Sequence, residues 1–239
     1  PTQDKTPHPT PTLDTYITRG HYDRATTRAP EGKAPGPDAI TNELIKHLPE
    51  STHTLIYNLF QIMAKYNYTP IDLCRSATCL LYKPNKKDPH NIASYNPIAL
   101  RNGILKLWTS ILTNIGSPWA EAQGILSDRT YGCRRHRKIY DSLSTHIMMY
   151  EDAKMSKKHI YTAYSDFKGA FGGMDHRILF KTMRDLGFPE CYINTCEQLY
   201  KVSGTYYMTP HGNTPTIPIH RGTLQGDTLS PFTFTIFME

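Results

Sequence analysis

The sequence lacks a hydrophobic run long enough to cross a membrane, and no apolar segment near its start could act as a secretory signal. It is also poor in cysteine, with five residues scattered over 239 positions. An odd, scattered set indicates the reduced thiols of an intracellular protein and argues against a disulfide framework. Neither Cys-x4-Cys pair has the second Cys or His pair that a structural zinc site needs, so a zinc module is not favoured.

What is present indicates a folded protein with a basic surface. Hydrophobic residues make up 38% of the chain and aromatic residues 11%, which is too much apolar material for a disordered protein. The length suits one or two domains. The net charge of +6 makes a polyanionic partner plausible.

The pattern along the chain divides it into two parts. The first 12 residues are rich in Thr and Pro and have no apolar period, so we expect residues 1–30 to form a flexible tail and lead-in to a folded unit at 31–239. The chain begins with Pro1 and reaches Glu239 directly after an apolar run. We therefore expect it to be a piece of a longer polypeptide.

Hydrophobic periodicity predicts an α+β fold, because helices and short strands follow one another irregularly. Asp38 is the expected N-cap of the first helix, Ser51 is expected to open the second, and Gly187 is the expected end of another. Helices are expected near residues 39–48, 51–63, 104–115, 143–150, 179–186 and 189–199. Strands are expected at 77–82 and 160–167, and in a hairpin formed by 206–209 and 216–220.

The first segment with chemical potential surrounds Asp166. This carboxylate follows an apolar, β-prone stretch, and the small residues Gly169 and Ala170 would let backbone N–H groups approach a triphosphate. Nucleotidyl transfer uses two divalent ions held by oxygen ligands, which Asp166 could help to bind. Phe171 could lie beneath a deoxyribose. Taken alone, such an Asp is more often a turn former, and such a Phe is more often a core residue.

The second segment is the run from Arg221 to Pro231. It carries Gln225 on a turn flanked by glycines and leads into an apolar stretch. Ser230 and Pro231 also suit the N-cap and first turn of a helix. A helix start and a functional turn are compatible readings of the same residues.

Together the two segments resemble blocks of the reverse transcriptases of non-LTR (LINE-type) retrotransposons. The family patterns are D-F-x-x-A-F-D-x-V-x-H and G-x-x-Q-G-x-x-L-S-P. The first block matches at Asp166, Phe167, Ala170, Phe171 and His176, and departs at Gly172, where the family usually has Asp. The second block matches at Arg221, Gly222, Gln225, Gly226, Leu229, Ser230 and Pro231.

Three upstream blocks extend the resemblance over about 31–239. Residues 32–38 resemble the K-A-P-G-P-D-G-I pattern, although a rigid Pro/Gly turn explains them equally well. Residues 81–100 resemble a block with a basic loop, but Asn96 replaces the family Arg. Residues 130–134 resemble Q-x-G-F-R and begin a run of positive charge, which is more often a solvated face than a site.

The resemblance implies a right-hand polymerase fold containing the fingers and part of the palm, with an incomplete palm sheet and no thumb. It implies RNA-directed DNA synthesis with an RNA template, a DNA primer, dNTPs and two Mg²⁺ ions in the complete parent enzyme, and a nuclear location. Asp166 would be the catalytic metal ligand beside the Phe167 carbonyl, and Phe171 the sugar gate. Nucleotide contacts are implied for Lys83, Gly169, Ala170, Phe171, Gln225 and Gly226, with template access at Gly226. Nucleic-acid contacts are implied for Lys86, Lys87, Arg134, Arg135 and Arg137.

The family's next block, an aromatic-Ala-Asp-Asp hairpin, does not occur in this sequence. One Asp cannot hold two metal ions, so we expect this chain alone not to polymerise, and its status as an enzyme stays open. The alternatives are an intron-encoded or other cellular reverse transcriptase, and a decayed or domesticated nucleic-acid-binding module without chemistry. Template preference and oligomeric state stay open as well.

Overall fold

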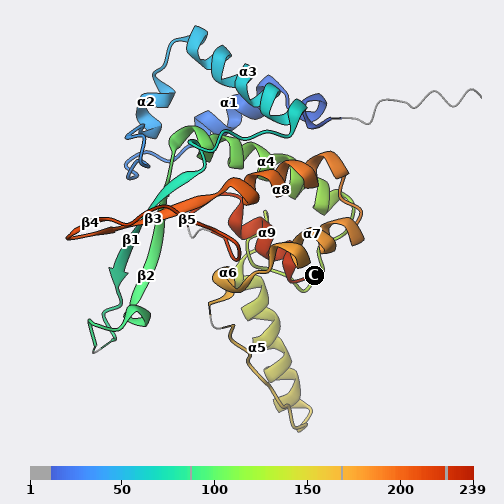
Figure 1. Ribbon diagram of the computed structural model, residues 1–239. Coiled ribbons are helices and arrows are strands. Elements are labelled where there is room, and N and C mark those ends of the chain that lie inside the picture. The colour runs from blue at the N-terminus through green and yellow to red at the C-terminus, as the bar shows by residue number, and fades with distance from the viewer. Residues whose placement is uncertain (1–11, 87, 168, 224–225) are drawn as a thin grey trace, which may run out of the picture.

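A computed structural model describes residues 12–86, 88–167, 169–223 and 226–239, and it has the α+β character expected from the sequence (Figure 1). The helices are η1 Leu13–Tyr16, α1 Arg19–Arg28, α2 Asn42–Lys46, α3 Glu50–Tyr66, η2 Ile92–Ser94, α4 Gly103–Ala122, α5 Ile139–Met155, α6 Ala170–Gly173, α7 His176–Asp185, α8 Glu190–Val202 and α9 Ser230–Phe237. The strands are β1 Arg75–Tyr82, β2 Tyr95–Arg101, β3 Gly204–Thr209, β4 Gly212–Asn213 and β5 Ile217–Pro218. No helix in this part of the chain combines the length and apolar character needed to cross a bilayer.

The strands form one small mixed sheet in the order β2-β1-β3-β4, with β5 also paired to β3. β1 and β2 form a long antiparallel hairpin whose tip projects from the body of the molecule (Figure 1). The strands at 77–82 and 206–209 and the loop between β1 and β2 are confirmed. The parallel pairing of β1 with β3 was not predicted, because it joins segments far apart in the sequence.

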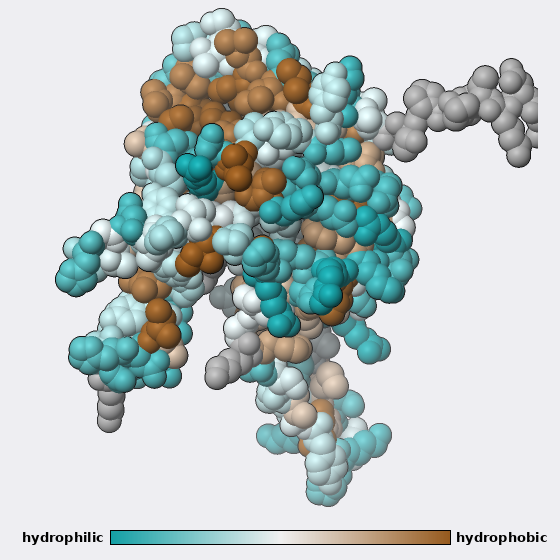
Figure 2. Space-filling view, in the orientation of Figure 1, coloured by the Kyte–Doolittle hydropathy of each residue, from teal (hydrophilic) through white to brown (hydrophobic). Residues whose placement is uncertain are grey.

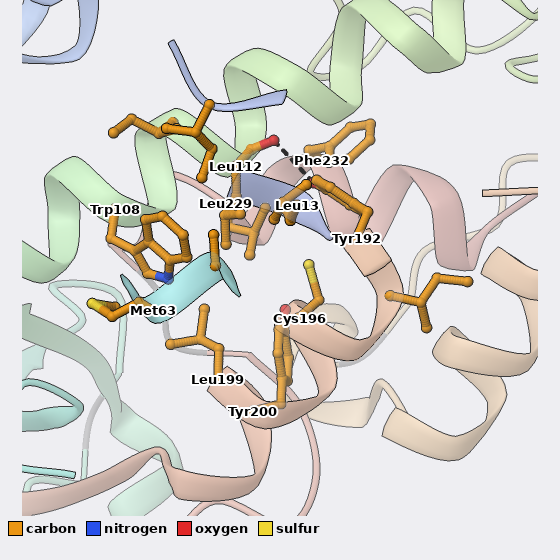
Figure 3. Close-up of a cluster of buried hydrophobic side chains, with 14 of the residues drawn as sticks. Leu13, Met63, Trp108, Leu112, Tyr192, Cys196, Leu199, Tyr200, Leu229 and Phe232 are labelled. Atoms are coloured by element: carbon orange, nitrogen blue, oxygen red, sulfur yellow. Dashed lines mark hydrogen bonds between the residues drawn. The ribbon is translucent and has the colours of Figure 1, made fainter. Parts of the chain in front are cut away.

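The main core lies around α4, which is the helix with the clearest apolar period in the sequence. Trp108 and Leu112 of this helix are fully buried, and they face side chains of α8 and α9 (Figure 3). The hydroxyl of Tyr192 donates a hydrogen bond to the Leu112 carbonyl at 3.0 Å. Gly116 makes this contact possible, because a Cβ there would lie 2.4 Å from the Tyr192 hydroxyl oxygen. Helix α4 is therefore the element against which the rest of the fold packs.

Part of the expected lead-in is folded, so folded structure begins before residue 31, where the sequence placed the start of the folded unit. Within it, η1 and α1 supply Leu13, Tyr22 and Ala25 to the same buried cluster as the rest of the chain. The sequence signal was weak because α1 presents few apolar side chains and is otherwise polar. Thr18 and His21 instead mark its start through a reciprocal capping box. Residues 1–11 lie outside the described ranges.

Asp38 does not cap the helix that follows it. Thr41 is the N-cap of α2, and its hydroxyl accepts a hydrogen bond from the Leu44 N–H. The Asp38 carboxylate instead accepts from the N–H of Ile40 at 3.1 Å and from the N–H of Gly103 at 3.2 Å. Asp38 thus satisfies a free donor at the start of α4, far along the chain.

Two further details of the helices differ from expectation. Helix α3 begins at Glu50 with Pro49 as its N-cap, so Ser51 does not open it. In α9 the N-cap is Leu229, so Ser230 is the first helical residue. The expected caps thus differ in detail, although the helices themselves are correctly placed.

Helix α5 projects from the body as an arm, and 156–167 returns along it (Figure 1). No residue of α5 is buried. The returning segment was expected to be a strand at 160–167, but it has no regular structure. A strand needs a ladder partner, and no described strand pairs with it. The arm is held by local contacts such as the 2.9 Å hydrogen bond between the hydroxyls of Tyr150 and Thr162.

Hydrogen exchange followed by mass spectrometry should therefore distinguish α5 from α4. We expect the amides of α5 to exchange fastest among the long helices, because an isolated helix without buried side chains opens locally at little cost. The amides of α4, which has many buried residues, should be the most protected. Equal protection of the two helices would contradict this description of the arm.

Candidate active site

The two sequence blocks singled out by their motifs lie against each other. Backbone and side-chain hydrogen bonds join them: Gly222 N–H to the Met174 carbonyl (2.7 Å), Thr223 N–H to the Phe171 carbonyl (2.9 Å), and Arg221 Nε to the Gly173 carbonyl (2.8 Å). His176 Nε2 lies 2.6 Å from the Gly222 carbonyl oxygen. Because a carbonyl only accepts, Nε2 carries the hydrogen. The matched His of the first block thus helps to fix the second.

Gly222 permits this approach. Its φ of +77° favours glycine, and a Cβ there would lie 2.7 Å from the Gly172 Cα. Packing does not explain why Gly172 replaces the Asp of the family pattern, because a Cβ at position 172 would meet nothing within 4 Å. Packing therefore requires glycine at 222 and not at 172.

A cleft of about 310 Å³ opens beside the joined blocks. Phe171, Arg221 and Thr223 line it together with residues of all three main strands, among them Ala99 of β2 and Thr205 of β3. Phe171 is half-buried, and its ring also packs on Phe234 of α9 with centroids 4.9 Å apart. The side chain thus reaches the cleft while it is braced from behind by a helix.

Asp166 does not lie in the cleft lining. It belongs to the exposed returning segment of the arm, as does Phe167, which is 61% exposed. Gly169, at φ +66°, starts α6 and leads through Ala170 to Phe171. The structure therefore does not bring Asp166 and Phe171 together at this cleft, and Gln225 lies outside the described residues.

A buried ion pair that the sequence did not reveal holds the turn after Gln225. Arg101, at the end of β2, is paired with Asp227, and their side chains are 4% and 3% exposed. Arg101 also donates from Nη2 to the Ser203 hydroxyl at 3.3 Å. Among the described residues, Arg101 Nε and Asp227 Oδ1 have no hydrogen-bond partner, and both residues line a cavity of about 10 Å³, the space of one water molecule. The only sequence signal was an Arg inside an otherwise apolar segment.

Comparison with known protein families shows to which family this chain belongs. A model of the reverse transcriptase (RNA-dependent DNA polymerase) family matches residues 84–239. The chain belongs to the reverse transcriptase family. The resemblance inferred from the motifs is thereby confirmed.

The relatives are polymerases of mobile elements. The chain is similar to a probable RNA-directed DNA polymerase from transposon BS of Drosophila melanogaster, with 24% identity over 87% of this chain and 23% of that protein. It is 23% identical to the RNA-directed DNA polymerase from mobile element jockey of Drosophila melanogaster, over 88% of this chain and 23% of that protein. It is 28% identical to the Pol polyprotein from type-1 retrotransposable element R2 of Nasonia vitripennis, over 86% and 19%. The chain thus spans less than a quarter of these relatives.

Reverse transcriptases use divalent metal ions, which require several oxygen ligands. Among the described residues, no three His, Cys, Asp or Glu side chains lie close enough to share a metal ion. Asp166 is a suitable donor, but alone it does not provide the ligand set of a two-metal centre.

The basic residues expected to contact nucleic acid fall into two groups. Lys83 and Lys86 lie on the tip of the β1–β2 hairpin, whose surface is hydrophilic in Figure 2. Lys86 is exposed, and Lys83 is half-buried with Nζ 3.2 Å from the Ala93 carbonyl oxygen. Lys87 lies outside the described residues. Neither Lys83 nor Lys86 pairs with an acidic side chain in the described part of the chain.

The arginine group is largely engaged within the protein. The side chain of Arg134 is 5% exposed. It donates to both carboxylate oxygens of Glu121, at 2.6 and 2.9 Å, and to two backbone carbonyls. This contact raises the pKa of Arg134 and lowers that of Glu121. Arg137 pairs with Asp128 at 2.6 Å, and Arg135 binds Asn114 but is exposed. The structure thus gives Arg134 a bracing role and leaves Arg135 the most accessible of the three.

The position of Gly226 also has a structural cause. Its φ is +111°, and a Cβ there would lie 2.9 Å from the Ala99 carbonyl oxygen. The close approach that this glycine allows in the structure is to β2. The contact with β2 alone explains why this position is glycine. Access of a template backbone at Gly226 stays a prediction.

The substitution Gly222→Ala should destabilise the protein by roughly 1 to 3 kcal/mol, because it forces an L-residue into the left-handed region against Gly172. Gly132→Ala is the control, since a Cβ there meets nothing and its effect should stay within about 0.5 kcal/mol. Urea unfolding of both variants measures the difference. Equal stability would show that the two blocks do not meet as described.

The buried ion pair gives a second prediction. Asp227→Ala should lower the free energy of unfolding by roughly 3 to 5 kcal/mol, because it leaves the Arg101 charge buried and unpaired. The double variant Arg101→Met/Asp227→Leu should recover most of this loss, since an apolar pair of similar volume carries no desolvation cost. A double variant that is no more stable than Asp227→Ala would refute this account.

Proposed function

We propose that this chain is the part of an RNA-directed DNA polymerase that binds the incoming nucleotide and the template, comprising the fingers and the first part of the palm. The observation that carries the proposal is the joining of the two family blocks through Gly222 and Thr223 beside one cleft. The fold supports the same division: the β1–β2 hairpin and α1–α4 would be the fingers, and α6–α9 with β3 the palm.

The cleft is suited to a deoxynucleoside triphosphate. Phe171 would lie beneath the sugar, where its ring leaves no room for a 2′-hydroxyl. The backbone of Gly169 and Ala170 starts a short helix and would face the phosphates. Lys83 would approach them from the hairpin. Gln225 would contact the base pair, as the resemblance implies.

Asp166, with the Phe167 carbonyl, would supply one ligand set for Mg²⁺ in the complete enzyme. Further carboxylates for a second ion would come from residues outside those described. The partners of the complete enzyme would be an RNA template, a DNA primer and dNTPs. Nuclear location follows from the resemblance alone.

Binding of a fluorescent single-stranded RNA to the chain, measured over a series of salt concentrations, tests this proposal. We expect the logarithm of the affinity to fall linearly with the logarithm of salt, because phosphate contacts release counterions. The variant Lys83→Gln/Lys86→Gln should reduce the slope by about 0.7 for each lost contact.

The matched control is Lys65→Gln/Lys201→Gln, which removes the same charge from α3 and α8. It should leave the slope unchanged. Binding without any salt dependence, or equal losses in the two variants, would contradict the proposed role of the hairpin. Failure of the chain to bind RNA or DNA at low salt would contradict the proposed function.

A further inference from the structure

Helix α3 carries a stripe of apolar side chains at the surface of the molecule. Leu55, Ile62 and Tyr66 are 68%, 53% and 67% exposed, and Leu59 between them is half-buried. At about 100° per residue, the four positions fall within about 60° of arc on one side of the helix. Figure 2 shows hydrophobic surface gathered over the region where Figure 1 places α3. The stripe is therefore continuous along the helix.

The spacing of the stripe is that of a helix–helix seam. Its four positions are separated by four, three and four residues, which is the alternation of the a and d positions in a coiled coil. A surface helix of a globular protein normally has one apolar stripe, which faces the core. In α3 a different row does this, since Phe60, Met63 and Ala64 are the buried residues. The stripe is therefore a second apolar face of the helix, and it lies at the surface.

The segment after α3 adds to the exposed apolar surface through Tyr68 and Ile71, each more than half exposed. Together with the stripe, these side chains leave on the order of 500 Å² of mainly apolar surface, which is near the upper end for the largest patch on a monomeric protein. Two such surfaces would bury on the order of 1,000 Å² in total, the lower limit for a specific interface. The area suits a dimer that forms in the micromolar range.

The charges of α3 lie away from the stripe. Glu50 pairs with Arg19 of α1 at 2.6 Å, and His53 Nδ1 lies 2.7 Å from the Tyr22 hydroxyl oxygen, so both residues face α1. The sequence of α3 contains one further charged residue, Lys65, which flanks the stripe. The face is thus apolar with a neutral and weakly basic edge, and it suits another apolar helix better than a polyanion.

We propose that α3 pairs with α3 of a second copy of this chain, with the two helices antiparallel. The spacing of four, three and four residues reads the same in both directions. A two-fold axis therefore places Leu55 opposite the partner's Tyr66, and Leu59 opposite the partner's Ile62. The helix dipoles then oppose each other, which a parallel pair does not allow. The Lys65 side chains of the two copies lie about 13 Å apart along the helices and do not meet.

The pairing leaves the cleft of each copy open. Among the described residues that line the cleft of about 310 Å³, none belongs to α3. The inference concerns a surface remote from that site, so it does not rest on the proposed function. It gives α3 a role beyond that of covering the core with Phe60 and Met63.

Sedimentation equilibrium of the whole chain over the micromolar range tests the association. The mass should rise with concentration from 27.3 kDa toward twice that value. Ile62→Glu should weaken association by roughly tenfold or more, because it places a charge from each copy in the apolar seam. The control is Ile178→Glu, since Ile178 of α7 has the same exposed fraction as Ile62. It should keep the wild-type curve.

Disulfide cross-linking tests the orientation, in a Cys133→Ser background that removes the exposed thiol. An equal mixture of Leu55→Cys and Tyr66→Cys chains should form a covalent dimer. Each variant alone should not, because like positions would lie about 16 Å apart along the helices, too far for a disulfide. Both side chains are exposed, so neither change disturbs the core.

A wild-type chain that stays monomeric throughout the range would overturn the proposal and leave the face to a different partner. Association of Ile62→Glu with the wild-type curve would overturn it as well, because the contact would then lie elsewhere. Efficient cross-linking of Leu55→Cys on its own would refute the antiparallel pairing.

Discussion

The buried ion pair between Arg101 and Asp227 is the constraint on which the arrangement of the site depends. It joins the end of β2 to the turn that follows Gln225, and through Ser203 it also reaches the end of α8. Such a pair contributes little net stability, because removing two charges from water offsets most of their attraction. Its effect is to select one register, since any other packing would leave a buried charge without its partner. The turn is thereby held to the sheet.

The residues after Arg101 extend this constraint to the N-terminal part of the chain. Asn102 donates to the carbonyls of Asp72 and Leu73 and accepts from the Asp38 N–H, while Asp38 caps α4 at Gly103. Gly36 lies so close to this junction that a Cβ would be 2.3 Å from the Arg101 carbonyl carbon. The Pro/Gly-rich block at 32–38 is therefore fixed to the start of α4.

The structural features that could be predicted from the sequence are those that depend on local hydrophobic periodicity or on motif spacing. Helix α4 followed from a continuous apolar face, and the end of α7 from Gly187, which has φ +79°. The pairing of β1 with β3 and the ion pair of Arg101 depend on contacts distant in sequence, so no local pattern contained them. The motifs singled out the two blocks that contain Phe171 and Gly222, and these blocks lie against each other in the structure.

The strand expected at 160–167 shows why the site divides into two parts. Its β-prone residues suit a pleated, half-buried surface, but strand structure requires a partner, and the segment lies instead along an exposed arm. Phe171 and Thr223 are held by the packed body, whereas Asp166 lies on the arm. The surfaces that would bind nucleotide and template are therefore set by the core of this chain. The position of Asp166, the proposed metal ligand, is not set by the core, and the described residues supply no contact that fixes it in the cleft.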